Sequence, residues 1–161
     1  MTVVADACPL IFLAKIRCLD LLERLFGSGI CLAESVRREI VEGPLTPAEA
    51  ETLARFLEAA VVEHVAAVRK HAAALSRADH GTLALALKRK ADLLLTDDRL
   101  LRELAVFEGV RPMGTLGVLL LAVRKGLLAK RAAKGHVDTL VRLHGFRISI
   151  EVYEAVAREL D

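Results

Sequence analysis

The sequence contains few aromatic residues and few cysteines. Aromatic side chains make up 4% of the 161 residues, and tryptophan is absent. The three cysteines, Cys8, Cys18 and Cys31, are an odd number, stand far apart and form no CxxC pair. This pattern argues against a disulfide framework and against a structural zinc site, and it favours a reducing compartment.

Long hydrophobic runs and a strong excess of one charge are also missing. The most apolar stretch, Leu116 to Val123, is too short to span a bilayer, and the N-terminus lacks the pattern of a signal peptide. We therefore expect a cytoplasmic protein with no membrane contact. Since the net charge is only +2, a nucleic acid would have to be held by local patches or by a metal ion.

What the chain does have is enough apolar sequence for a folded domain: 54% of its residues are hydrophobic. Short apolar runs alternate with helical patterns, and this alternation predicts βαβ units with a parallel sheet. Strands are expected at 3–5, 30–32, 61–62, 93–95 and 109–112. Helices are expected at 10–26, 33–42, 47–59, 79–90 and 99–107, and residues 65–78 are ambiguous.

The predicted fold class is therefore α/β, a three-layer α/β/α sandwich with a central parallel sheet and extra C-terminal helices. A single domain is expected over residues 1–161, with a core over about 1–113 and a helical extension over about 114–161. In the extension, helix breaks are expected at Gly126, Gly135 and Gly145, and Ser149 is expected to cap a final helix.

Acidic residues follow two of the predicted strands. Asp6 comes directly after the strand at 3–5, and Asp97 and Asp98 follow the strand at 93–95. The carboxyl ends of parallel strands meet at one edge of the sheet, where ligands bind in such folds. Asp79 opens a helix that should start at the same edge. Each Asp could instead cap the helix that follows it, which is the commoner role for one such residue alone. Several acids at one edge favour a site.

Glu39 needs a different explanation, because it lies inside a predicted helix beside Val36 and Ile40. From spacing alone, a solvated acid paired with neighbouring arginines is the simpler interpretation. If these acids gather, each ionised pair near 4 Å repels by about 4 kcal/mol at an effective dielectric constant near 20. Such a cluster must hold protons or bind a cation. Oxygen ligands suit Mg²⁺ or Mn²⁺, which can activate water to cut a phosphodiester.

Six segments together carry a family resemblance. They are VVADACPLI (3–11), VRREI (36–40), ADHGTLALAL (78–87), ADLLLTDDR (91–99), GTLGVLL (114–120) and GFRIS (145–149). In their order and spacing they resemble PIN domains, the ribonuclease fold of VapC-type toxins. The chain looks most similar to a PIN-like subfamily that starts Asp-Ala-Ser-Pro-Leu-Ile.

The resemblance implies a metal-dependent endoribonuclease that acts as the toxin of a type II toxin–antitoxin pair. It also implies Mg²⁺ or Mn²⁺ as cofactor, an RNA substrate, a small antitoxin as partner, and a homodimer. The implied catalytic residues are Asp6, Glu39, Asp79 and Asp97. The implied metal ligands are Asp6, Asp79, Asp97 and Asp98.

Two departures from the family pattern concern this site. Cys8 stands where Ser or Thr is usual, which removes a hydroxyl donor. Ala78-Asp79-His80-Gly81 stands where the subfamily often has Gly-Glu-x-Glu, so the acid there is one methylene shorter. Basic residues in or near the acidic segments could contact phosphates, although solvated faces are the commoner role: Arg37, Arg38, Arg99, Arg102 and Lys125.

Other classes of protein fit less well. A nucleotide-binding loop is disfavoured because Gly27-Ser28-Gly29 precedes a strand rather than a helix, and a phosphoacceptor receiver would need a paired acid and a lysine that are absent. A metal-independent ribonuclease using Arg131 and His136 is a minor alternative. The main rival is a catalytically weak or inactive PIN-like domain that binds a protein or RNA.

Overall fold

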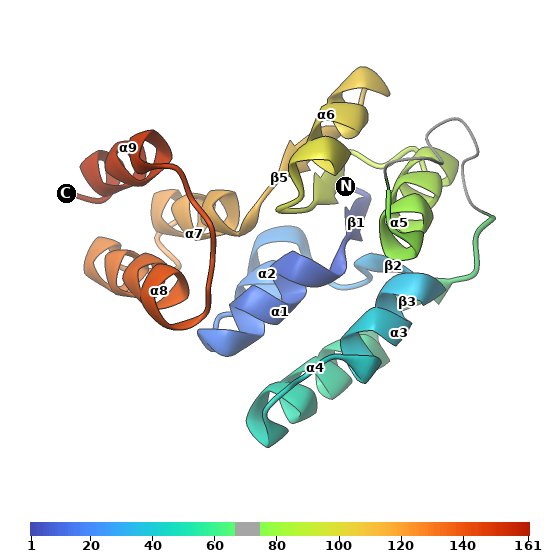
Figure 1. Cartoon of the computed structure of the whole chain (residues 1–161), viewed down its shortest axis with the longest axis horizontal. Coiled ribbons are helices and arrows are strands. Elements are labelled where there is room, and N and C mark those ends of the chain that lie inside the picture. The colour runs from blue at the N-terminus through green and yellow to red at the C-terminus, as the bar shows by residue number, and fades with distance from the viewer. Residues whose placement is uncertain (67–74) are drawn as a thin grey trace.

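The computed structural model of the chain describes residues 1–66 and 75–161. Within these residues, all neighbouring strands of the sheet are parallel, and their order is β3-β2-β1-β4-β5 (Figure 1). The parallel sheet expected from the alternating pattern is thus confirmed. The strands are β1 (Val3–Ala5), β2 (Cys31–Ala33), β3 (Val61–Glu63), β4 (Leu93–Leu95) and β5 (Arg111–Met113).

The apolar strands lie at the centre of the sheet and the mixed strands lie at its edges. Every residue of β1, β2 and β4 is buried, which matches their runs of small and aliphatic side chains. β3 and β5 carry Glu63 and Arg111 because one side of each strand is open. In the register, Ala5 pairs with Leu95, so β1 and β4 end level with one another.

Helices surround the sheet in a three-layer α/β/α arrangement, as predicted. α5 packs on β1 and β2, and α6 packs on β5. Figure 1 shows α7, α8 and α9 together at one end of the molecule, where the C-terminus lies. The helices are α1 (Ala7–Lys15), α2 (Asp20–Phe26), α3 (Glu34–Glu42), α4 (Pro47–Ala59), α5 (Arg77–Lys88), α6 (Arg99–Phe107), α7 (Thr115–Arg124), α8 (Lys130–Leu143) and α9 (Ile150–Leu160).

The C-terminal helices share the hydrophobic core of the sheet. Val137 and Leu140 of α8 and Val156 of α9 are buried in the same cluster as the residues of β1 and β4. Phe146, in the loop before α9, packs edge-on against Phe12 of α1 with ring centroids 4.9 Å apart. No helix in the described part of the chain is long and apolar enough to cross a membrane.

Two predicted helix boundaries were wrong. The helix expected at 10–26 is two helices, because Arg17 adopts a left-handed φ of 57° and the chain turns before α2. The helix expected to begin at Asp79 begins at Arg77 instead. Ser76 is its N-cap, and Asp79 is the third helical residue of a capping box in which each side chain bonds the other residue's backbone N–H.

In the C-terminal region, two of the three expected helix breaks are confirmed. Gly126 and Gly145 follow helices with φ of 70° and 65°, as glycines after helix ends often do. The break predicted at Gly135 was wrong, because α8 runs through this residue. Part of the ambiguous stretch 65–78, residues 67–74, lies outside the described residues.

Candidate active site

Asp6 directly follows β1 at the carboxyl edge of the sheet, and its side chain is buried, with only 3% of its surface exposed. Its Oδ1 accepts the N–H of Ala7 at 2.8 Å, which caps α1. Its Oδ2 accepts the hydroxyl of Thr96, which follows β4, at 3.1 Å. The chain leaves β1 toward β2 and β3 and later returns to β4 and β5 on the other side. Asp6 therefore lies at the topological switch point where ligands bind in α/β sheets.

Within residues 1–66 and 75–161, no positive charge balances the Asp6 carboxylate. Its pKa is raised from 3.8 to about 7, mainly by burial and in addition by the negative charges of Asp79 and Glu39. The hydrogen bonds from Ala7 and Thr96 oppose this shift but do not cancel it. Asp6, Glu39 and Asp79, three of the predicted site residues, therefore lie close enough together for their charges to interact.

Close packing of α3 on α5 brings Glu39 and Asp79 to this edge. At Gly81 of α5, a Cβ atom would lie 2.3 Å from the Ser35 Oγ of α3, so a side chain there would force the Ser35 hydroxyl to move. Glu39 is exposed on α3, and its pKa is raised by partial desolvation and by the charge of Asp79. Asp79 also accepts the Ser76 hydroxyl at 2.7 Å through Oδ2.

Asp97 is held by a different set of contacts. The backbone N–H of Thr115 donates to Oδ1 at 2.7 Å, and the Thr115 hydroxyl donates to Oδ2 at 2.6 Å. Burial raises the pKa of Asp97, while the Thr115 bonds and the charge of Arg102 lower it. A Cβ atom at Gly114 would lie 2.7 Å from Asp97 Oδ1, so the start of α7 fits tightly around this carboxylate.

The other two residues at this edge differ in their exposure and contacts. Asp98 is exposed, and its Oδ1 caps α6 by accepting the Leu101 N–H at 2.7 Å. Cys8 is exposed on the first turn of α1. Desolvation raises the pKa of its thiol to about 12, and the charges of all four predicted catalytic acids act in the same direction. The Cys8 sulfur therefore lies within the field of the whole acidic group.

The donor chemistry of this edge fits Mg²⁺ or Mn²⁺, since hard carboxylate oxygens with uncompensated charge are what these ions bind. Among residues 1–66 and 75–161, however, no three His, Cys, Asp or Glu side chains stand close enough together to hold a metal ion. To hold one ion together, these acids would have to lie closer to one another than they do here. Glu39 is exposed on α3, whereas Asp79 is partly buried and holds the capping box with Ser76.

Most of the basic residues named as possible phosphate contacts have carboxylate partners. Arg37 and Arg38 both pair with Glu34, at 3.4 Å and 3.7 Å. Arg99 pairs with Glu103 at 3.0 Å. Arg102 is the one whose charge reaches the site, through Asp97.

The alternative pair for a metal-independent ribonuclease does not form a site here. His136 and Arg131 lie five residues apart on α8, which places them about 140° apart around the helix. The His136 Nε2 lies 3.3 Å from the buried Cys18 Sγ, and burial lowers the pKa of the imidazole. His136 therefore helps to join α8 to the turn before α2.

Two contributors to the site were missed by sequence reasoning. Thr96 and Thr115 are both fully buried, and each donates its hydroxyl to a site carboxylate. Both lie in segments that carry the family resemblance. The carboxylates that they bond are 90 and 18 residues away in the sequence, and no local sequence pattern predicts a hydrogen bond over such a separation.

Comparison with known families agrees with this geometry. The family model DUF3368, a PIN domain, matches residues 2–161. No curated protein and no solved structure matches the chain. The chain belongs to the PIN domain family, whose members are generally nucleases and typically use divalent metals. The narrower assignment to a subfamily by its starting motif stays a prediction.

Replacing Thr115 by Val should destabilise the protein by about 1–3 kcal/mol, because Asp97 loses a buried donor to a charged group. Urea unfolding followed by circular dichroism measures this. Thr139→Val is the matched control, since the Thr139 hydroxyl bonds only the Gly135 carbonyl on an exposed helix face, and its effect should stay within about 0.5 kcal/mol. Equal effects of the two changes would contradict the role given to Thr115.

The raised pKa of Asp6 predicts how stability depends on pH in metal-free protein. The folded state keeps the Asp6 proton up to about pH 7, whereas the unfolded state releases it near pH 4. Because the folded state binds more protons in this window, the free energy of unfolding should fall as pH rises through it, by up to about 4 kcal/mol. Asp6→Asn should remove this part of the pH dependence. Parallel curves for wild type and variant would contradict the prediction.

Proposed function

We propose that this protein is a metal-dependent endoribonuclease that hydrolyses RNA phosphodiester bonds. The observation that carries the proposal is the buried carboxylate of Asp6 at the switch point of the sheet. Its charge is opposed by burial and by Glu39 and Asp79, and no cation in the described part of the chain balances it. The charged form of this carboxylate is disfavoured in the metal-free fold, and groups with pKa values shifted in this way gather at functional sites.

In this proposal Asp6, Asp79 and Asp97 hold the metal, together with Asp98, and Glu39 completes the acidic group. Bound there, Mg²⁺ or Mn²⁺ would supply the positive charge that activates water and stabilises the departing oxygen. Asp98 would bind the metal without giving up its cap on α6, because the Leu101 N–H engages only one of its two carboxylate oxygens.

The remaining residues of the site orient these acids. Ala7 and Thr96 hold the two oxygens of Asp6, and Thr115 holds both oxygens of Asp97. Donors of this kind fix the direction of a ligand's lone pairs, and their loss typically costs 10- to 100-fold in metal affinity or activity. Among the described residues, Arg102 is a cation whose charge reaches Asp97, and in this proposal it meets a substrate phosphate.

The biological setting follows from the family resemblance. We propose that the protein is the toxin of a type II toxin–antitoxin pair, that it works in the cytoplasm as a homodimer, and that a small antitoxin inhibits it. The second candidate function is a PIN-like domain that binds RNA or protein without cutting. It is favoured by the spread of the acids, which form no three-residue metal group within the described residues.

Cleavage of labelled single-stranded RNA in Mn²⁺ tests the proposal. Wild type should cut, and Asp6→Asn should lose activity by on the order of 100-fold or more, because a ligand matters at least as much as the groups that orient it. Thr96→Val should lose roughly 10- to 100-fold for the same reason. EDTA should abolish cutting.

Glu58→Gln, an exposed change on α4, is the control and should cut like wild type. Equal cutting by all variants, with or without EDTA, would show that the acidic edge does not cut RNA and would point to a contaminating nuclease. Absence of cutting by folded, partner-free protein would favour the binding module.

Metal binding can be measured without substrate. At pH 8, saturating Mn²⁺ should raise the melting temperature of wild type, since a ligand at 100 times its Kd contributes about 2.7 kcal/mol. The shift should be smaller at pH 5.5, where Asp6 holds its proton. Asp6→Asn should lose the shift, and Glu58→Gln should keep it. An undiminished shift in Asp6→Asn would show that the metal binds elsewhere.

A further inference from the structure

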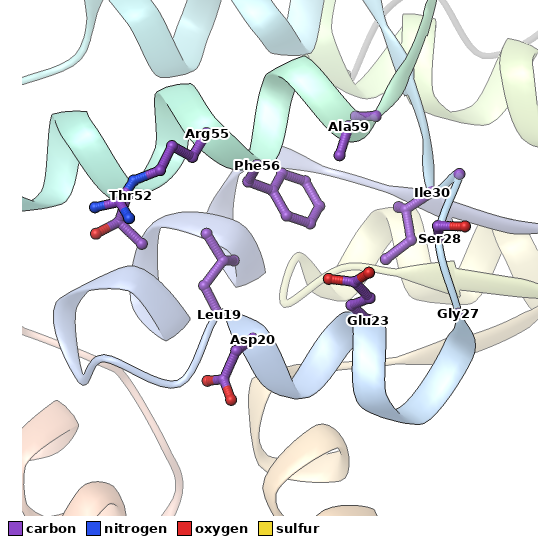
Figure 2. Close-up of a pocket in the computed structure, with 12 residues that line it drawn as sticks. Leu19, Asp20, Glu23, Gly27, Ser28, Ile30, Thr52, Arg55, Phe56 and Ala59 are labelled. Atoms are coloured by element: carbon purple, nitrogen blue, oxygen red, sulfur yellow. The ribbon is translucent and has the colours of Figure 1, made fainter.

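A cavity lies at the other edge of the sheet from the acidic residues. It has a volume of about 400 Å³ and lies between α2, the loop at 27–30 and α4 (Figure 2). Ile30 and Ala60, which line it, directly precede β2 and β3, so the cavity opens at the amino edge of the sheet. The candidate active site is at the opposite, carboxyl edge.

The interior of this cavity is apolar. Leu19 and Ile30 are almost fully buried, each 4% exposed, and Phe56 of α4 is partly buried. Figure 2 shows the Phe56 ring and the Leu19 side chain pointing toward the space between α2 and α4. Ala59, near the end of α4, leaves the opening wide because its side chain is short. The volume is in the range of small-molecule sites.

The charged groups at the rim are unequally engaged. Asp20 pairs with Arg24 at 3.6 Å, and Arg55 pairs with Glu51 at 3.0 Å. Glu23 makes no ion pair with any residue that the structure describes. In Figure 2 the Glu23 carboxylate points toward the cavity, whereas the Asp20 carboxylate points away from it. The rim therefore presents one unbalanced negative charge next to an apolar interior.

We propose that this cavity binds a small amphipathic amine. Its alkyl or aryl part fills the space between Leu19, Ile30 and Phe56, where burial of apolar surface favours it. Its ammonium group lies at the rim and pairs with Glu23. An anionic ligand of the same shape meets the repulsion of Glu23, and a neutral one gains only the apolar contact.

Three probes of one shape test this: 3-phenylpropylamine, 3-phenylpropanol and 3-phenylpropionate. Titration of ¹⁵N-labelled full-length protein should move the amide signals of Leu19, Ile30 and Phe56. The amine should bind most tightly and the carboxylate most weakly. Glu23→Gln should weaken the amine about 2- to 5-fold, as expected for an exposed ion pair, and leave the alcohol unchanged.

Two further variants make the result decisive. Glu58→Gln removes a charge from α4 outside the cavity and should leave all three affinities as they are. Ala59→Leu fills the opening at an exposed helical position that leucine suits, so it should weaken all three probes at least 10-fold while the protein stays folded. Absence of binding, equal affinity for amine and alcohol, or equal effects of Glu23→Gln and Glu58→Gln would each overturn the proposal.

RNA cleavage separates this site from the proposed active site. Glu23→Gln and Ala59→Leu should cut RNA like wild type, because neither residue lies at the carboxyl edge. The titrations test the cavity proposal, and RNA cleavage by the Asp6 variant tests the nuclease proposal.

Discussion

The burial of one carboxylate shapes the centre of this protein. Asp6 continues the ladder between β1 and β4 through its backbone N–H, which donates to the Leu95 carbonyl at 2.8 Å. The same residue caps α1 and accepts the Thr96 hydroxyl. Strand, helix and neighbouring strand are therefore joined at a group whose charged form is unfavourable there. The strands on either side, β1 and β4, are fully buried and apolar, so this polar group lies at the edge of the hydrophobic core.

The acids at this edge are of two kinds. Asp6, Glu39 and Asp79 share one region of negative charge, and the close contact of α3 with α5 at Gly81 keeps these charges near one another. Asp97 is instead satisfied by Thr115 and by the charge of Arg102. A cation would therefore be attracted most strongly by Asp6, Glu39 and Asp79. Asp97 would offer a ligand whose orientation Thr115 already fixes. This difference in surroundings is a physical reason for the four acids to differ in how strongly they would attract a cation.

Much of this architecture could be predicted because it depends on local signals. The short apolar runs identified the central strands, and parallel pairing then placed Asp6 and Asp97 on one edge. The break at Arg17 was missed because the apolar periodicity continues through it. Gly135 was misread as a break, although α8 carries it on an open face where a glycine costs only about 1 kcal/mol. The convergence of Glu39 and Asp79 depends on how two helices cross, and that information is not local.

The hydrogen bonds from Thr115 to Asp97 also bear on where this chain can be divided. A boundary drawn near residue 113 separates a sheet-bearing part from a helical part, and it also separates the two partners of these bonds. The first turn of α7 is thus an integral wall of the acidic edge, not an appendage. A fragment ending at Met113 would keep all of its acids, but Asp97 would be left without its two donors and free to rotate. The C-terminal third of the molecule therefore contributes no acid to this edge but holds one of its acids in place.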